Sequence, residues 1–393
     1  MSKASKSWAG AFLAAAVVAG LTATVVPAQA SAGSQAPRAA AAPVVLASGL
    51  HNPRGVRVQA DGSVVVTEVG SGSGAPCAAP PVGAPLARCL GFTGSLYQVK
   101  GSTQSRIVTG LPSEQIVRSD GLTRVNGAIQ SEATAKGAYR VVYGLSGVPA
   151  DRAALGADAA PLGTLSIAGG RVLGDLADHE GRLDPDSVLG NNDVFSNPHD
   201  FARDGKDFLV TDAAGNTLIR VHPDGTTTTE FVFPNNVLPA AASASGAQSS
   251  ADATVLAAPA GQTEAVPTGI VRGRDGAFYI STMSGMNKDL TRIWRYVPGS
   301  APTVFVSGLT DVIDLALAPN GDLIALSYGT GPASALGPGA LTRINKKTGA
   351  LTPIDTGSRL KVPFGLDVSA NGDVYVTNDI DTTGELLKFP AAV

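Results

Sequence analysis

Four polar residues occupy corresponding positions in a repeated sequence unit and could act on one ligand: Asn126, His199, Asp200 and Asp314. Carboxylate and amide oxygens are the ligands that Ca²⁺ prefers, and water can complete its shell of six to eight oxygens. A cation held by Asn126, Asp200 and Asp314 would act as a Lewis acid on an ester carbonyl, with His199 as the base. This pattern predicts a metal-dependent lactonase-like hydrolase as one possible function.

The same residue types also have a purely structural use. Asp and Asn often cap turns and strand ends, and no Glu stands at any of the corresponding positions. The sequence therefore favours a binding or accessory protein without catalysis, with the hydrolase as the alternative, and it identifies no catalytic residue. The complete set of candidate ligand-binding positions is Arg54, Asn126, His199, Asp200, Thr268 and Asp314.

Other patterns that could carry chemistry lack the context they need. The glycine-rich run 70–74 leads into a cysteine-containing loop, whereas a phosphate loop leads into a helix. None of the four histidines is accompanied by a G-x-S-x-G motif. His179 lies in an acidic segment, 174–187, whose spacing does not match the twelve-residue calcium loop, so a solvated charged loop is favoured there.

A repeated unit of strand, turn and strand positions the candidate residues. In its four full copies a Pro or Val precedes a Gly by nine residues, and an Asp or Asn comes directly before each Gly. Asp-Gly and Asn-Gly between β-branched runs predict a tight hairpin, because Gly tolerates positive φ. A third strand follows each copy, and a fourth strand follows every copy except the last. The copies are 52–68, 266–282, 311–327 and 362–378, with a shorter one at 197–212.

The second strands are apolar almost throughout, so both faces of each four-stranded antiparallel sheet must be covered. Sheets that stack face to face around an axis form a β-propeller. A weaker sixth unit fits residues 122–173, and the unit that begins at 362 lacks a fourth strand. Residues 43–50 supply that strand. The sequence therefore predicts an all-β, six-bladed propeller in which the N-terminal strand completes the last blade and closes the ring.

Residues 1–30 are typical of an export signal with cleavage after Ala30, because two lysines precede a long apolar run and an A-x-A triplet. Residues 31–42 would form a disordered linker, and residues 43–393 the propeller domain. The stretch 239–261 is predicted to be a low-complexity loop. Short helices are expected within 149–160 and 174–187.

Composition limits the partners of the exported chain. Loss of Lys3 and Lys6 with the signal lowers the formal charge from −3 to about −5, and Lys and Arg do not cluster along the sequence. Both observations argue against nucleic acid. No later segment is apolar enough to span a membrane after cleavage of the signal. We expect a secreted monomer that binds an extracellular small molecule or protein, with a disulfide between Cys77 and Cys89.

The chain resembles the ScyD/ScyE family of exported proteins over almost all of its mature length. The resemblance implies a six-bladed, NHL/TolB-like propeller outside the cytoplasm, but no catalytic mechanism. Residues 281–289 depart from the acidic segment that is usual in the family. The resemblance is carried by LASGLHNPRG, the Cys77/Cys89 loop with GFTGSLYQV, RIVTGLP, GDLADHE, SNPHD, VTDAAGNTLIRV, AVPTG, RIWRYVPGSAPTVFVSGLTDVIDLAL and GELLKF.

Overall fold

A computed structural model describes residues 42–74, 77–80, 84, 86–191, 193–239, 258–390 and 392–393. The predicted export signal and nearly all of the predicted linker lie outside these residues, as does most of the predicted loop 239–261. All described residues belong to one unit of the contact pattern.

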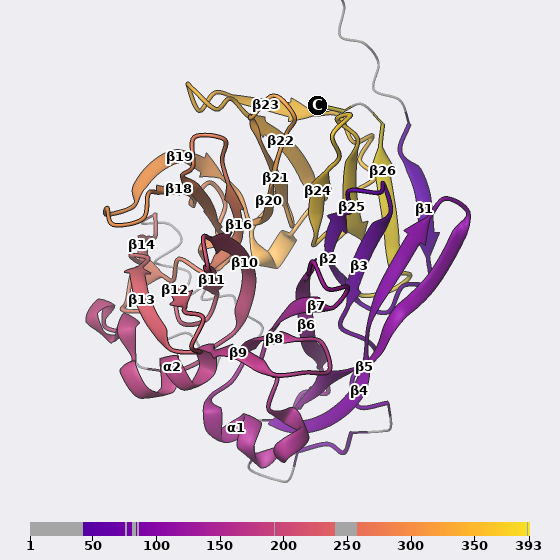
Figure 1. Cartoon of the computed structure of the whole chain (residues 1–393). Helices are drawn as coiled ribbons and strands as arrows, with labels where there is room; N and C mark the ends of the chain where they lie inside the picture. Colours follow the sequence, from indigo (N-terminus) through magenta and orange to yellow (C-terminus); the bar gives the residue numbers. More distant parts are fainter. Residues whose placement is uncertain are drawn as a thin grey trace, which may run out of the picture. The chain divides into compact units, whose positions relative to one another are not determined.

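Six four-stranded antiparallel blades follow one another along the chain (Figure 1). Blade one contains β2 (Pro53–Val58), β3 (Val64–Glu68), β4 (Leu86–Lys100) and β5 (Thr103–Arg118). Blade two contains β6 (Thr123–Ala133), β7 (Tyr139–Tyr143), β8 (Thr164–Ile167) and β9 (Val172–Asp175). Blade three contains β10 (Pro198–Asp204), β11 (Asp207–Asp212), β12 (Thr217–Val221) and β13 (Thr227–Val232).

The second half of the chain repeats the pattern. Blade four contains β16 (Pro267–Arg272), β17 (Phe278–Thr282), β18 (Thr291–Tyr296) and β19 (Thr303–Leu309). Blade five contains β20 (Val312–Leu317), β21 (Leu323–Ser327), β22 (Ala340–Ile344) and β23 (Leu351–Ile354). Blade six contains β24 (Leu366–Val368), β25 (Val374–Asn378), β26 (Glu385–Phe389) and β1 (Val44–Ser48).

The ring closes as the sequence predicted. β1 pairs antiparallel with β26, with Val44 opposite Lys388 and Ser48 opposite Glu385. The first strands of successive blades also contact one another in the cyclic order β2, β6, β10, β16, β20, β24 and back to β2. The all-β, six-bladed propeller is therefore confirmed, with the first strands surrounding a central channel.

The hairpin turns explain the repeated Gly. Gly62, Gly276, Gly321 and Gly372 have φ between 79° and 88°. In the first turn the Gly62 N–H donates to the Gln59 carbonyl, and the Gln59 N–H donates to the Ser63 carbonyl. Each of the four turns is thus a three-residue hairpin loop whose left-handed position is occupied by Gly.

Apolar second strands form the core between blades. β3, β17, β21 and β25 are buried at every residue. Burying one such Val, Leu or Phe side chain contributes about 1.5–3 kcal/mol relative to leaving it exposed. Neighbouring sheets share these residues, as in the cluster that joins Ile324 and Leu326 of blade five to Val374 and Val376 of blade six.

One feature of the sheets goes beyond the repeat. β5 continues past its predicted end, so that Ser113–Val117 pair with Thr123–Gly127 of β6 and join blades one and two in one eight-stranded sheet. The predicted disulfide lies beside this extension, linking Cys77 to Cys89 of β4. The bond is consistent with an oxidising compartment.

Short helices occupy the connections where they were expected. They are α1 (Pro149–Ala154) and η1 (Ala157–Ala159) in blade two, then α2 (Leu176–Leu183) and η2 (Pro185–Leu189) before blade three. The pair β14 (Asn236–Val237) and β15 (Gln262–Thr263) flanks the 239–261 segment, and η3 (Ser284–Met286) and η4 (Ala333–Ala335) lie in later connections. No helix among the described residues has the length and hydropathy to cross a bilayer.

Candidate functional site

The predicted channel carboxylates are buried and hold adjacent blades together. One oxygen of Asp200 accepts a hydrogen bond from the Ile270 N–H of blade four at 3.0 Å, and the other lies 3.2 Å from the Arg57 guanidinium. Asp314 accepts from the Leu366 N–H of blade six at 2.7 Å. Burial raises the pKa of both carboxyl groups, against the opposing effect of Arg57.

Asp367, which was not among the predicted residues, does the same at the next blade boundary. It accepts from the Val58 N–H of blade one at 2.7 Å. The predicted residue Thr268 serves a fourth boundary, because its hydroxyl donates to the Val312 carbonyl at 2.7 Å. This repeated use in inter-blade hydrogen bonds favours a structural role for the channel carboxylates over metal coordination.

Asn126 makes its contacts elsewhere. Its Nδ2 donates to the Ser146 hydroxyl and to Oδ1 of Asn197, both at 2.9 Å, and its own Oδ1 accepts the Gly127 N–H. None of these partners is Asp200 or Asp314. Among the described His, Cys, Asp and Glu side chains, the group close enough to share a cation is a different one, Glu180, Asp184 and Asp186.

His199 and Arg54 pack on the same aromatic ring in the channel. The His199 ring stacks on Phe364 with centroids 5.1 Å apart, and the Arg54 guanidinium lies 4.6 Å from the centre of that ring. Burial and the positive charge of Arg54 lower the pKa of His199 to about 3. A base of that pKa is poorly matched to catalysis near neutral pH.

Side chains fill the channel at this level. The cavity bounded by His199, Asp200, Asp314 and Phe364 measures about 10 Å³. A cavity needs roughly that volume to hold one water molecule. This cavity beside His199, Asp200 and Asp314 is therefore too small for a substrate.

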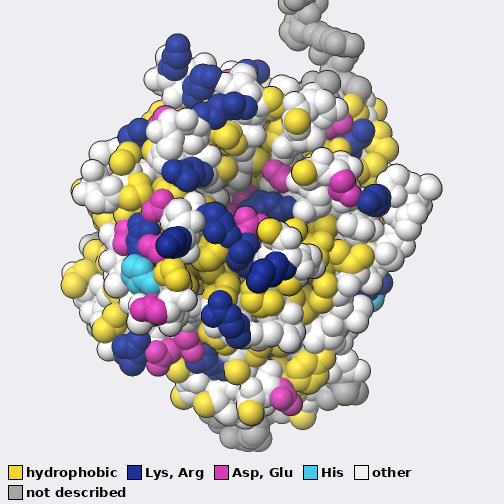
Figure 2. Space-filling view, in the orientation of Figure 1, with side chains coloured by type: hydrophobic (Ala, Val, Ile, Leu, Met, Phe, Trp, Pro, Cys, Tyr) yellow, Lys and Arg dark blue, Asp and Glu magenta, His cyan; other side chains and the backbone are white. Residues whose placement is uncertain are grey.

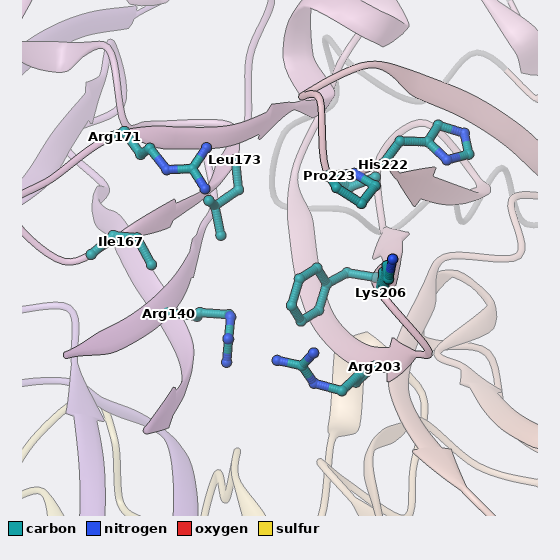
Figure 3. A pocket seen from close by; sticks show the side chains of 10 residues that line it. Arg140, Ile167, Arg171, Leu173, Arg203, Lys206, His222 and Pro223 are labelled. Carbon is teal, nitrogen blue, oxygen red and sulfur yellow. The ribbon is translucent and has the colours of Figure 1, made fainter. Parts of the chain in front are cut away.

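Larger hollows lie on the face formed by the hairpin turns, the side seen in Figure 2. Lys and Arg side chains gather around the centre of this face (Figure 2). A groove of about 200 Å³ runs between blades two and three (Figure 3). It is lined by Arg140, Ile167, Arg171, Leu173, Arg203, Lys206, Phe208, Val221, His222 and Pro223.

Two of the groove's cations are fixed on an aromatic ring. The guanidinium carbons of Arg140 and Arg203 lie 5.0 and 4.9 Å from the centre of Phe208. Arg140 is held further by Glu132 at 2.7 Å. Such cation–π pairs contribute about 0.5–1 kcal/mol at exposed sites, so they help to position the two guanidinium groups.

The other two cations of the groove are Arg171 and Lys206, and both are exposed. Neither has an ion pair or side-chain hydrogen bond within the described part of the chain. Their positive charge is therefore available to an anion. Ile167, Leu173 and Val221 add an apolar wall on which the body of a small organic molecule could pack.

A second hollow of about 260 Å³ lies next to the groove, at the channel end of the same face. Arg203 lines both, and Arg57 and Arg272 contribute to the second. Here Glu132 and Asp367 also reach the surface of the hollow, so its charges are mixed. The groove between blades two and three is the more uniformly positive of the two.

The sequence did not reveal this arrangement. Lys and Arg do not cluster along the sequence, but four of them line one groove in the folded protein. Arg140 and Arg171 flank two hairpin turns of blade two, and Arg203 and Lys206 flank one hairpin turn of blade three. Basic residues beside the turns of neighbouring repeat units are the sequence pattern that could have identified this groove.

Comparisons with known proteins give weak matches. No protein-family model matches the chain, and no curated protein matches it significantly. A catalytically inactive variant of virginiamycin B lyase from Staphylococcus aureus, solved with quinupristin, is 12% identical, with 88% of this chain and 97% of that chain covered and a TM-score of 0.46.

Two further solved structures are similar to the same degree. Regucalcin, a calcium-binding protein from Agrobacterium tumefaciens, is 11% identical, with coverage of 89% and 93% and a TM-score of 0.46. A putative gluconolactonase is 12% identical, with coverage of 90% and 93% and a TM-score of 0.43. Because these likenesses are weak, the propeller assignment rests on the strand pairing described above.

Proposed function

We propose that this protein is an exported, accessory β-propeller that binds a small organic anion in the groove between blades two and three. The observation that carries the proposal is the set of four cations, Arg140, Arg171, Arg203 and Lys206, around an apolar wall. A net negative protein that concentrates positive charge in one groove favours anions there. The apolar wall favours an anion with an aromatic or aliphatic body.

Binding rather than catalysis is proposed because of the lining residues. They supply positive charge and apolar surface, with His222 as the one histidine among them. The hydrolase alternative depends on the channel residues, whose oxygens are used in inter-blade hydrogen bonds. The ScyD/ScyE-type assignment and the extracellular location belong to this proposal and are supported by the sequence motifs and by the disulfide.

The test uses 2-naphthoate as a probe, because it joins a carboxylate to an apolar body. Isothermal titration calorimetry at low ionic strength should show saturable binding, and the double variant Arg171→Gln/Lys206→Gln should weaken it at least tenfold. The control Lys288→Gln/Lys347→Gln makes the same change of charge at exposed positions outside the groove. Absence of saturable binding, or equal weakening in the control, would refute the proposal.

A further inference from the structure

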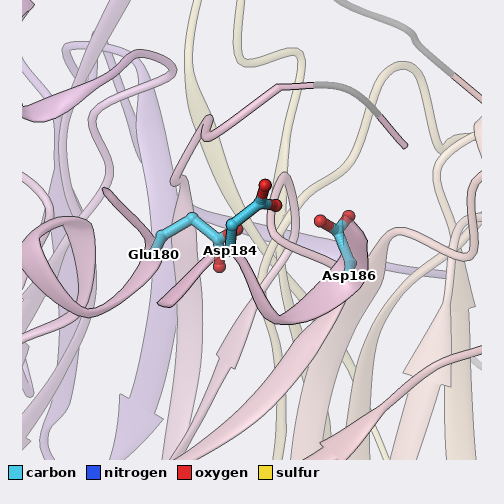
Figure 4. Close-up of side chains that lie close together, drawn as sticks. All are labelled: Glu180, Asp184 and Asp186. Atoms are coloured by element: carbon cyan, nitrogen blue, oxygen red, sulfur yellow. The ribbon is translucent and has the colours of Figure 1, made fainter. Parts of the chain in front are cut away.

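Three carboxylates meet where the chain passes from blade two to blade three. Glu180 lies on α2, Asp184 joins α2 to η2, and Asp186 lies on η2 (Figure 4). Each offers an oxygen, and these oxygens all lie within 4.8 Å of one another. Among the described residues, no other group of three or more His, Cys, Asp or Glu side chains comes this close.

Glu180 and Asp186 are buried, Asp184 is half-buried, and several of their oxygens lack partners among the described residues. Glu180 is 0% exposed and Asp186 2% exposed. Both oxygens of Glu180, and one oxygen each of Asp184 and Asp186, are buried without a hydrogen-bond partner in the described structure. No ion pair joins any of the three to a Lys or Arg within the described part of the chain. An unpaired buried carboxylate is costly, so these oxygens require a ligand or a proton.

Surrounding amides fix the position of the group. The other oxygen of Asp186 accepts hydrogen bonds from the side-chain amides of Asn191 at 2.8 Å and Asn216 at 2.9 Å. Asn191 is bonded in turn to Asn235 at 2.9 Å, and the Asn235 amide oxygen is itself buried without a partner. Asp186 is thus held by amides from two separate segments, and Asn235 supports one of these amides.

Neighbouring charged groups on α2 are engaged elsewhere. The two ring nitrogens of His179 bond to the hydroxyls of Thr227 at 2.9 Å and Thr229 at 2.8 Å. Asp178 pairs with Arg182 at 2.7 Å. The expectation of a solvated charged loop is therefore wrong for Glu180 and Asp186, although Asp178 fits it.

We propose that Glu180, Asp184 and Asp186 form a binding site for Ca²⁺. The donors are all oxygens, which suits a hard cation, and they lack the nitrogen or sulfur that would favour zinc. Ca²⁺ also tolerates irregular geometry with several protein oxygens, whereas Mg²⁺ demands near-ideal octahedral coordination and keeps its waters. The site is independent of the anion-binding groove and of the channel residues predicted from the sequence.

The electrostatics of the group agree with the geometry. Burial, together with the nearby Asp212, Asp186, Asp184 and Asp193, raises the pKa of Glu180 to about 10. A cation bound at this position would act against these causes, because it favours the deprotonated carboxylate.

The experiment titrates the chelator-treated full chain with CaCl₂ by calorimetry at pH 7.5. We expect one Ca²⁺ per chain and a thermal midpoint that rises with CaCl₂ concentration. MgCl₂ should bind at least tenfold more weakly.

Glu180→Gln is the decisive variant. A neutral amide has nearly the same shape as a carboxyl group, so this variant should fold. It should weaken Ca²⁺ binding at least tenfold, whereas the control Asp178→Asn, on the same helix, should bind as the wild type does. No heat and no change of the thermal midpoint up to about 5 mM CaCl₂ would overturn the proposal. It would also fail if Asp314→Asn abolished binding while Glu180→Gln retained it, since the ion would then lie in the channel.

Discussion

Asp314 and Glu180 are both buried carboxylates, but their surroundings supply hydrogen-bond donors very differently. In the channel, Asp314 accepts the Leu315 N–H and, across the blade boundary, the Leu366 N–H, both at 2.7 Å. In the connection after blade two, both oxygens of Glu180 lack partners in the described structure. The same kind of group therefore stabilises the ring at one place and calls for an external ligand at the other.

The difference shows that position in a repeat does not by itself identify a binding site. A carboxylate on a first strand can accept hydrogen bonds from backbone N–H groups of the next blade, as Asp200, Asp314 and Asp367 do. A carboxylate in an irregular connection depends on the hydrogen-bond donors of its own surroundings. The number of donors near a buried acid is thus the property that separates a structural role from a binding role.

The largest loss of stability is expected for Asp314→Ala. Removing this acceptor leaves two buried backbone N–H groups without a partner and removes a hydrogen bond between blade five and blade six. We expect a loss of roughly 3 kcal/mol in the free energy of unfolding, measured by urea denaturation with an unchanged slope. A loss below about 0.5 kcal/mol would mean that the channel carboxylates are not structural. The contrast between Asp314 and Glu180 would then not hold.

Glu180→Gln should have the opposite effect in the absence of calcium. The folded wild type keeps a proton on Glu180 up to a pKa of about 10, whereas the unfolded chain releases it near pH 4.5. Wild-type stability should therefore fall as pH rises between these values, by up to about 1.4 kcal/mol per unit. The variant should lack this part of the slope. Urea unfolding in chelator at pH 5 and 8 tests this, with Asp178→Asn as the control.

His199 tests the contrast between channel and connection, because it lies in the channel and yet its ring nitrogens have no hydrogen-bond partner among the described residues. Its folded pKa of about 3 lies below the unfolded value of 6.5, so only the unfolded chain takes up a proton between them. Stability should fall as pH drops below 6.5, by roughly 2 kcal/mol at pH 5. His199→Phe, which can keep the stacking on Phe364, should reduce this acid sensitivity, measured by thermal unfolding from pH 4.5 to 7.

The smallest effect on stability is expected in the groove. Arg171 and Lys206 are exposed, so the double change to Gln should alter the free energy of unfolding by less than about 0.5 kcal/mol. Anion binding should nevertheless weaken tenfold or more. A stability loss comparable to that of Asp314→Ala would show that these cations serve the fold and not a ligand.

The fold could be predicted from the sequence because its determinants are local and repeated. The nine-residue spacing to Gly62 and its counterparts fixes a hairpin in each unit, and the leftover strand at Val44–Ser48 fixes the closure. The extension of β5 toward β6 could not be read in this way, since no other unit contains it.

The candidate sites were less accessible to prediction. Register places the candidate residues on the first strands of their blades, but hydrogen-bond partners such as Ile270 and Leu366 belong to other blades. Arg140 and Arg203 lie far apart in sequence and meet at Phe208 because blades two and three pack together. The burial of Glu180 depends on the packing of α2 against blade three, which apolar periodicity alone does not give.

The pairing of β1 with β26 also constrains the order of folding. The two strands come from opposite ends of the described chain, so completing blade six closes a loop that contains the other five blades. Contacts between such distant segments form slowly, because the loop they close is long. Until that step β26 has an unpaired edge that could join another chain. A period of vulnerability to aggregation is therefore built into the way this molecule is assembled.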